Sequence, residues 1–220
     1  MDRYERNKPA ISPEDQERLA GCRVLVAGCG GLGGHIIEIL ARIGVGHITV
    51  VDGDKFIVSN LNRQLFSSEE NIGRCKPLCA AERIAAVNPL VEIIPVCEPL
   101  SKDNADTLLA DMNLAIDALD NGPSRLLLAH AARKAGIHLV SGAIDGWYGR
   151  VTVLRPGDDT DFLWEGPAGA SSGNLSATAA CVASIQASQA VKLLLNKGFA
   201  LTKRLLEIDL LHCDFDIVEV

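Results

Sequence analysis

The chain has 220 residues, of which 48% are hydrophobic, and a formal net charge of −7. This length suits one sizeable domain, and the acidic balance argues against nucleic acid as the main partner, although a local basic site stays possible. No uninterrupted apolar run is long enough to span a bilayer, and the charged residues 1–6 do not resemble a signal peptide. We therefore expect a cytoplasmic protein with no membrane partner, whose seven cysteines are reduced thiols.

The N-terminal residues predict an arm followed by a short helix. Residues 1–12 show no periodicity and are expected to form an irregular arm that carries Arg3 and Arg6. Ser12 is a typical N-cap, and it is followed by a proline and two acidic residues. This order predicts a helix over residues 13–20.

A glycine-rich turn follows the first predicted strand. Residues 23–27 are mostly apolar and predict a buried strand, and apolar residues recur at helical spacing after the turn. Strand, turn and helix form the context in which Gly-x-Gly-x-x-Gly binds a nucleotide, although a turn without a ligand is the alternative. A second strand over residues 47–51 ends at Asp52, where a ribose-binding carboxylate is expected. The glycines of the turn are Gly28, Gly30, Gly31 and Gly33.

The remainder of the chain alternates between predicted helices and strands. Periodicity predicts helices over residues 77–87, 101–110, 123–135 and 176–196, and strands over residues 91–96, 114–117, 138–141, 147–154, 203–209 and 213–219. Residues 156–175 are rich in Gly, Asp, Ser and Ala and are expected to form a mobile loop. We predict an α/β fold in which helices wind around a mainly parallel, Rossmann-like sheet that ends in antiparallel strands. No linker marks a second domain, so residues 1–220 are expected to form one domain.

A long polar segment, residues 53–75, follows the second predicted strand. A segment of this length within an α/β unit is usually functional. Because ligands bind past the carboxyl ends of parallel strands, we expect its side chains to meet the glycine turn and the residues after the fourth strand. Cations there would neutralise a polyphosphate and a carboxylate would hold Mg²⁺, whereas each cation taken singly is equally well a surface residue. The candidates are Asp52, Arg63, Gln64, Lys76 and Asp120.

Six motifs together are specific enough to indicate a family. They are Arg3-Tyr4-x-Arg6, the glycine turn, Asp52-x-Asp54 followed by Ser59-Asn60-Leu61-Asn62-Arg63-Gln64, Ile72-Gly73-x-x-Lys76, Asp117-x-x-Asp120-Asn121, and Ser184-Ile185-Gln186-Ala187-x-x-Ala190-x-Lys192-Leu193. With these motifs the chain resembles the ThiF/MoeB/HesA family, the bacterial relatives of ubiquitin-activating enzymes. The resemblance covers residues 3–195.

The resemblance implies an activity and a set of site residues. Members of the family are adenylyltransferases that use ATP and Mg²⁺ to adenylate the C-terminal carboxylate of a small ubiquitin-like, sulfur-carrier type protein, with release of pyrophosphate. By resemblance, Asp52 binds the ribose, Asp120 holds Mg²⁺, and Arg6 acts in the site of the other copy of a homodimer. The residues implied to surround the phosphates are Asn60, Arg63, Gln64 and Lys76. Gly28, Gly30, Gly31, Gly33 and Asp54 complete the nucleotide-binding set, and Arg63, Lys76, Asp120 and Arg6 form the catalytic set.

The chain departs from the family in its cysteines. Many members bind zinc through two Cys-x-x-Cys pairs, and neither pair is present. The nearest pattern, Cys75-x-x-x-Cys79, supplies only two ligands, so zinc is not expected. Residues 156–175 contain no cysteine, and Cys181 lies in a small-residue helical run without a neighbouring cation. We therefore expect adenylation without an obligatory thioester.

Other functions stay open on the sequence alone. A related branch of the family dehydrates a modified tRNA base through ATP-dependent adenylation. An NAD(P)-dependent oxidoreductase would use the same glycine turn, but it would not need Arg63, Lys76 or Asp120. A non-catalytic scaffold would not need the charged residues at all. The identity of the acceptor protein and its pathway is likewise open.

Overall fold

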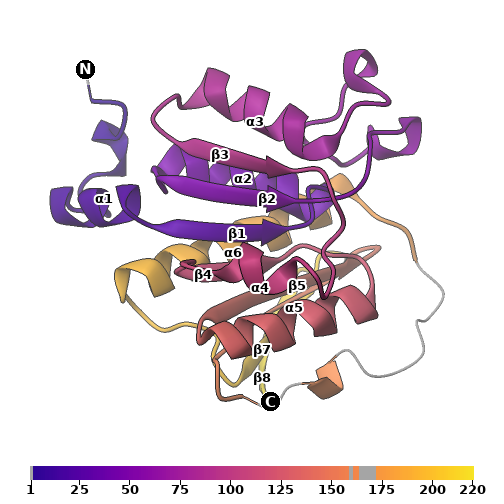
Figure 1. Cartoon of the computed structure of the whole chain (residues 1–220). Coiled ribbons are helices and arrows are strands. Elements are labelled where there is room, and N and C mark those ends of the chain that lie inside the picture. Colours follow the sequence, from indigo (N-terminus) through magenta and orange to yellow (C-terminus); the bar gives the residue numbers. More distant parts are fainter. Residues whose placement is uncertain (1, 159–160, 164–171) are drawn as a thin grey trace.

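The computed structural model describes residues 2–158, 161–163 and 172–220. Within these ranges an eight-stranded sheet has the order β3-β2-β1-β4-β5-β6-β7-β8. Helices cover both faces of the sheet (Figure 1). The predicted fold class, a Rossmann-like α/β sheet with antiparallel C-terminal strands, is confirmed.

The first five strands along the chain are parallel and form one side of the sheet. β1 (Arg23–Ala27) pairs with β2 (His47–Val51) on one side and β4 (Leu114–Asp117) on the other, and β3 (Glu92–Val96) and β5 (His138–Asp145) flank them. The first three strands are added toward one edge of the sheet, from β1 to β2 to β3. After β3 the chain returns past β1 to form β4 on its other side, so the strand order switches direction between β1 and β4. The crevice at such a switch is where open α/β sheets bind ligands.

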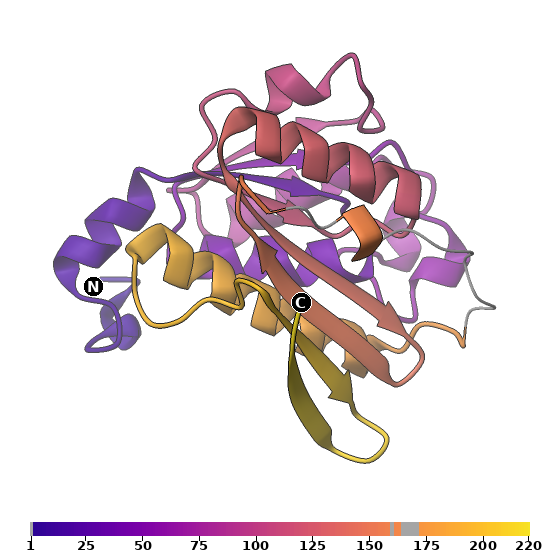
Figure 2. The same cartoon turned by 90° about the horizontal axis from the view of Figure 1, so that it is seen from below.

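Three antiparallel strands complete the sheet. They are β6 (Tyr148–Leu154), β7 (Arg204–Asp209) and β8 (Asp214–Glu219). Figure 2 shows β7 and β8 as a hairpin that extends away from the parallel strands. β5 was expected to end at residue 141, but it continues to residue 145 because its last residues pair with β6, as in the pair Asp145↔Tyr148.

The helices divide between the two faces of the sheet. Residues of α2, α3 and α6 share one apolar core, and residues of α4 and α5 share the other. Two cores on opposite faces explain why the parallel strands are continuously apolar rather than alternating. The helices are α1 (Pro13–Ala20), α2 (Gly31–Ile43), α3 (Lys76–Val87), α4 (Ala105–Leu109), α5 (Gly122–Ala135) and α6 (Ser176–Leu195).

By length and composition, α6 could cross a membrane, although no uninterrupted apolar run in the sequence is long enough to span a bilayer. Of the 18-residue window with this property, 56% is buried within the protein. A Cβ atom at Gly142 would lie 2.3 Å from Gln186, and one at Gly149 would lie 2.3 Å from Val182. α6 therefore packs directly on the backbone of β5 and β6, and this packing accounts for its apolar composition.

The N-terminal arm is more ordered than its sequence suggests. It contains a 3₁₀ helix, η1 (Glu5–Asn7). Arg3 Nη1 donates to Asn88 Oδ1, and Asn88 Nδ2 donates to the Tyr4 hydroxyl at 2.8 Å and to the Ala41 carbonyl at 2.7 Å. The arm therefore lies against the C-terminal ends of α2 and α3, at the amino edge of the parallel strands (Figure 1).

Two connecting segments differ from simple loops. The segment 53–75 contains the 3₁₀ helices η2 (Val58–Asn60) and η3 (Glu69–Asn71). Part of the predicted loop 156–175 forms another, η4 (Asp161–Leu163). The expected mobility of that loop concerns residues that lie largely outside the described ranges.

The expectation of seven reduced thiols is wrong for two cysteines. Cys75 and Cys97 form a disulfide with their Cα atoms 6.3 Å apart. Cys75 is the N-cap of α3 and Cys97 follows the last residue of β3, so the bond joins two segments that the sheet places side by side. The Cys75 sulfur is therefore not a thiolate ligand, whereas Cys79 is a buried free cysteine.

Candidate active site

A cavity of about 530 Å³ lies past the carboxyl ends of β1, β2 and β4. The residues that follow these strands, the segment 53–75 and the start of α3 all contribute to its wall. The sequence-predicted site residues that line it are Gly28, Gly30, Gly31, Asp52, Asp54, Arg63, Gln64, Lys76 and Asp120.

The glycine turn forms the floor between β1 and α2. Gly28 has φ 98°, which favours glycine, and its N–H donates to the Val51 carbonyl at 2.8 Å. A Cβ atom at Gly33 would lie 1.9 Å from the Gly28 carbonyl oxygen, so α2 packs directly on the turn. No side chain in the described ranges caps the start of α2. Free amides at a helix start favour an anion in the cavity.

A carboxylate that is 11% exposed and a buried ammonium lie beside this turn. Asp52 Oδ2 accepts from the Cys29 N–H at 2.7 Å, and Oδ1 accepts from the Asp54 N–H at 2.8 Å. Lys76 Nζ lies 3.9 Å from Asp52 Oδ2 and 2.9 Å from Asp54 Oδ2. Burial raises the pKa of Asp52, while the Cys29 N–H and Lys76 oppose that rise. Asp52 is thus an acceptor with fixed orientation beside a fixed cation.

The segment 53–75 brings Arg63 and Gln64 against the glycine turn, since a Cβ atom at Gly31 would lie 3.5 Å from Arg63 Cγ and one at Gly30 would lie 3.6 Å from Gln64 Nε2. Arg63 Nη1 donates to the Ser59 carbonyl at 3.1 Å and to Asn62 Oδ1 at 2.8 Å. Gln64 is 7% exposed, and its Oε1 is buried with no hydrogen-bond partner among the described residues. A buried, unpaired acceptor in a cavity wall is well suited to a donor group of a ligand.

Asp120 lies in the loop between β4 and α5 and is exposed to the cavity. Its Oδ1 accepts from Asn121 Nδ2 at 3.2 Å, and in the described part of the chain it forms no ion pair. The described residues contain no group of three or more His, Cys, Asp or Glu side chains suited to a metal ion. A single free carboxylate fits Mg²⁺ that is bound mainly by substrate phosphates.

Three sequence-predicted site residues lie outside the cavity lining. Gly33 lies behind the turn. Asn60 is buried and organises its own segment, since its Oδ1 accepts from the Ile57 N–H at 3.1 Å and its carbonyl accepts from the Gln64 N–H at 2.9 Å. Arg6 is exposed on the arm, at the far edge of the sheet. The structure does not bring Arg6 to the cavity of its own chain.

The sequence analysis missed several residues of the wall. One of them is the cation Arg125, whose side chain is 10% exposed. It lies on α5, and only the packing of α5 against the sheet brings it to the cavity, so no local pattern marked it. The other lining residues that were not predicted as site residues are Leu32, Val51, Gly53, Pro99, Leu100, Ala118, Leu119, Asn121, Ser124, Ile144, Asp145 and Asn174.

The cysteines near the site are poor nucleophiles. Cys29 is buried in the glycine turn, and burial raises the pKa of its thiol far above the ordinary range. Burial also raises the pKa of Cys181, which lies on α6. Only a thiolate attacks, so neither cysteine is activated by its surroundings.

The site therefore combines helix-start amides, three cations and four carboxylates around one space. Amides and cations suit a polyanion, and Asp52 suits a hydroxylated group such as a ribose. Asp120 is free to share a metal ion with that polyanion. This arrangement fits a nucleoside triphosphate better than a nicotinamide dinucleotide, which carries only a pyrophosphate.

Comparison with known proteins gives a concordant result. Residues 4–220 match the ThiF family. The chain is 39% identical to the SAMP-activating enzyme E1 of Haloferax volcanii, over 99% of this chain and 84% of that protein. It is 37% identical to the sulfur carrier protein adenylyltransferase of Thermus thermophilus, over 98% of this chain and 85% of that protein. The crystal structure of E. coli MccB shares the fold, with a TM-score of 0.85 at 16% identity, over 100% of this chain and 70% of that chain.

The close approach at the glycine turn leads to a stability prediction. A Cβ atom at Gly28 would lie 2.4 Å from the Ala118 carbonyl oxygen, in addition to the positive φ. We expect Gly28→Ala to lower the free energy of unfolding by roughly 3 kcal/mol or more, measured by urea denaturation. Gly73→Ala is the matched control, because Gly73 has φ 84° but no atom within 4 Å of a built Cβ. It should cost only about 1 kcal/mol, and equal losses in the two variants would contradict the steric argument.

Proposed function

The chain belongs to the ThiF family, and on that premise we propose that it is an adenylyltransferase of the ubiquitin-activating-enzyme-like class. It uses Mg²⁺ and ATP to adenylate the C-terminal carboxylate of a small ubiquitin-like, sulfur-carrier type protein. The observation that carries the proposal is the cavity that gathers Asp52, Lys76, Arg63 and Asp120 at the switch point of the sheet. The names of the two relatives, a SAMP-activating E1 and a sulfur carrier protein adenylyltransferase, support the acceptor class.

The residues of the cavity divide the reaction between them. An oxygen of the acceptor carboxylate attacks the α-phosphorus, the bond from that phosphorus to the bridging oxygen breaks, and pyrophosphate leaves with the electron pair. Asp52 accepts hydrogen bonds from the ribose hydroxyls, while Lys76 and Arg63 stabilise the charge that develops on pyrophosphate. Mg²⁺, held by Asp120, supplies further neutralisation of the phosphates when it is bound.

The proposal includes the organisation of the protein. We propose that residues 1–220 form one ATP-binding adenylation domain that acts as a cytoplasmic homodimer. Arg6 lies beside the C-terminal end of α2, and 13 helical residues separate that end from the glycine turn, about 20 Å at 1.5 Å per residue. This separation supports the proposal that Arg6 acts in the site of a second copy.

The activity is tested by ATP–pyrophosphate exchange with and without small proteins that end in a glycine carboxylate. Thermal shifts with ATP, NAD and NADP separate the adenylyltransferase from an oxidoreductase. We expect exchange that depends on such a protein, and thermal stabilisation by ATP but not by NAD or NADP. Stabilisation by NAD or NADP without exchange would overturn the proposal.

We expect Arg63→Ala and Lys76→Ala each to lower the exchange rate about 10²–10³-fold, the loss typical of one preorganised donor. Lys76 is 4% exposed and pairs with Asp54, so its variant should also lose stability, whereas Arg63→Ala should melt like the wild type. Lys134→Ala is the control, since Lys134 forms an exposed ion pair with Asp106 on the outer surface. Near-normal exchange in Arg63→Ala and Lys76→Ala would refute the site assignment.

Substitutions of Asp52 and Asp120 should affect nucleotide binding and magnesium dependence separately. Asp52→Ala should weaken ATP binding and leave its response to magnesium intact, because Asp52 faces the ribose. Asp120→Ala should abolish the response to magnesium. A titration of ATP affinity against magnesium concentration measures both effects, and an Asp120→Ala protein with wild-type magnesium dependence would disprove the metal role.

Subunit mixing tests the role of Arg6. Neither Arg6→Ala nor Lys76→Ala alone should be active, but their mixed dimer contains one complete site. An equal mixture should recover up to roughly a quarter of wild-type exchange, because half of its dimers are mixed and each has one intact site of two. Absence of rescue after demonstrated subunit exchange would count against action between subunits.

A further inference from the structure

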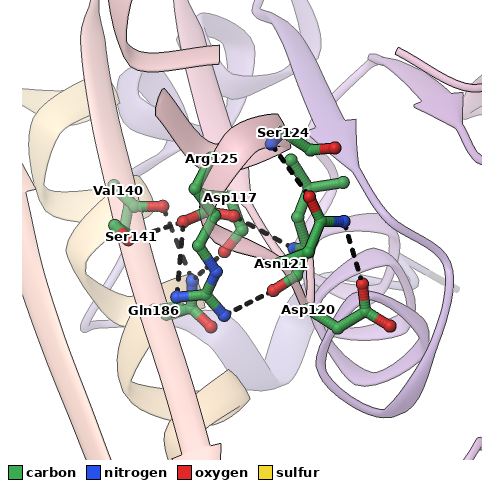
Figure 3. Close-up of polar contacts among 9 residues, drawn as sticks. Asp117, Asp120, Asn121, Ser124, Arg125, Val140, Ser141 and Gln186 are labelled. Carbon is green, nitrogen blue, oxygen red and sulfur yellow. Dashed lines mark hydrogen bonds and ion pairs between the residues drawn. The ribbon is translucent and has the colours of Figure 1, made fainter. Parts of the chain in front are cut away.

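Side chains hold both polar groups of the Leu119 backbone. The Leu119 N–H donates to Asp117 Oδ1 at 3.0 Å, and its carbonyl accepts from Arg125 Nη2. Arg125 Nη1 in turn lies 3.9 Å from Asp117 Oδ2, so the two side chains that hold Leu119 also pair with each other (Figure 3). The Leu119 carbonyl belongs to the peptide bond whose nitrogen is that of Asp120.

Asp117 is anchored from two further elements. It is 0% exposed at the end of β4. Its Oδ2 accepts from Ser141 Oγ on β5 at 2.6 Å, and its carbonyl accepts from Gln186 Nε2 on α6 at 2.8 Å. Its carboxylate is therefore a fixed point in the core, to which Arg125 is bound (Figure 3).

Burial makes this carboxylate dependent on its counter-ion. Loss of solvent raises the pKa of Asp117, and Arg125 is the strongest influence that opposes the rise. A buried carboxylate that loses its cation is strongly unfavourable, so Arg125 has little freedom to leave. Its guanidinium geometry lets one group serve both Asp117 and the Leu119 carbonyl, which a lysine ammonium at one point does not reproduce.

Asp120, by contrast, has few contacts of its own. Among the described residues, its carboxylate receives one hydrogen bond, from the neighbouring Asn121 side chain. Its position therefore depends on the backbone that carries it. Because a misplacement of about 1 Å at a reacting centre lowers rates about 10²-fold, control of this backbone matters for the chemistry.

We propose that Arg125 is a positioning residue, which fixes the Leu119–Asp120 peptide against the buried Asp117 and thereby aims the Asp120 carboxylate into the cavity. The inference rests on the proposed function, in which Asp120 holds Mg²⁺ beside ATP. Arg125 acts on the metal through Asp120, and it touches neither the nucleotide nor the metal itself.

The test compares ATP affinity by calorimetry in EDTA and in saturating magnesium; the ratio of the two affinities is the magnesium enhancement. Arg125→Lys, which keeps the charge, should lower this enhancement about 10-fold or more and leave the affinity in EDTA unchanged. Exchange at saturating ATP and magnesium should fall about 10–100-fold. Asp117→Asn, which keeps an acceptor for the Leu119 N–H, should give the same pattern and serves if Arg125→Lys does not fold.

Two controls separate positioning from a general structural effect. Arg133 lies on the same helix and donates hydrogen bonds to the Asp158 carbonyl and to Asp161 Oδ1. The magnesium enhancement of Arg133→Lys should therefore equal that of the wild type. In an Asp120→Asn background, Arg125→Lys should cause no further loss, since both changes act through one carboxylate.

Three outcomes would overturn the inference. An unchanged enhancement in both Arg125→Lys and Asp117→Asn would refute positioning while leaving the proposed function intact. A loss of ATP affinity in EDTA would show that Arg125 contacts the nucleotide directly. If the wild-type protein binds ATP without any magnesium enhancement, the metal role of Asp120 is refuted, and the inference with it. A wild-type protein that binds no ATP is a separate result, which would refute the proposed function itself.

Discussion

The backbones that follow β1 and β4 touch, and the cavity depends on this contact. With the Ala118 carbonyl oxygen only 2.4 Å from a built Cβ of Gly28, any residue other than glycine would force the two segments apart. β1 and β4 are neighbours whose onward connections run to opposite sides of the sheet. Their meeting point is therefore where the glycine turn from one half and Asp120 from the other face the same space.

Two carboxylates flank this contact, of which Asp117 is fully buried and Asp52 is partly buried, and each pairs with a buried cation. Asp52 pairs with Lys76 on one side, and Asp117 pairs with Arg125 on the other. Such pairs add little net stability because desolvation opposes their attraction. Their effect is to fix charges and backbone before a ligand arrives, so little reorganisation is needed when charge develops on the phosphates. The stability of the fold rests instead on the two apolar cores.

Local patterns in the sequence predicted most of the backbone. The Ser12 N-cap, the helix over residues 13–20 and the strand over residues 23–27 each depend on neighbouring residues, and the structure has all three. The glycine turn is similar, since the φ of Gly28 follows from a tight strand-to-helix connection. The ends of elements were less accurate where pairing with another strand decides them, as at the extended end of β5.

The sequence by itself determined the succession of strands and helices along the chain, the glycine turn and the family, because each is encoded in residues that are close along the chain. Only the tertiary structure decided which distant side chains meet. The Cys75–Cys97 disulfide, the place of Arg125 in the cavity wall and the separation of Arg6 from the site all depend on strand order and helix packing. The same holds for Asn60, which organises its own segment rather than lining the cavity. Contacts of this kind follow from topology and register, and these are set by burial of the whole chain rather than by any local pattern.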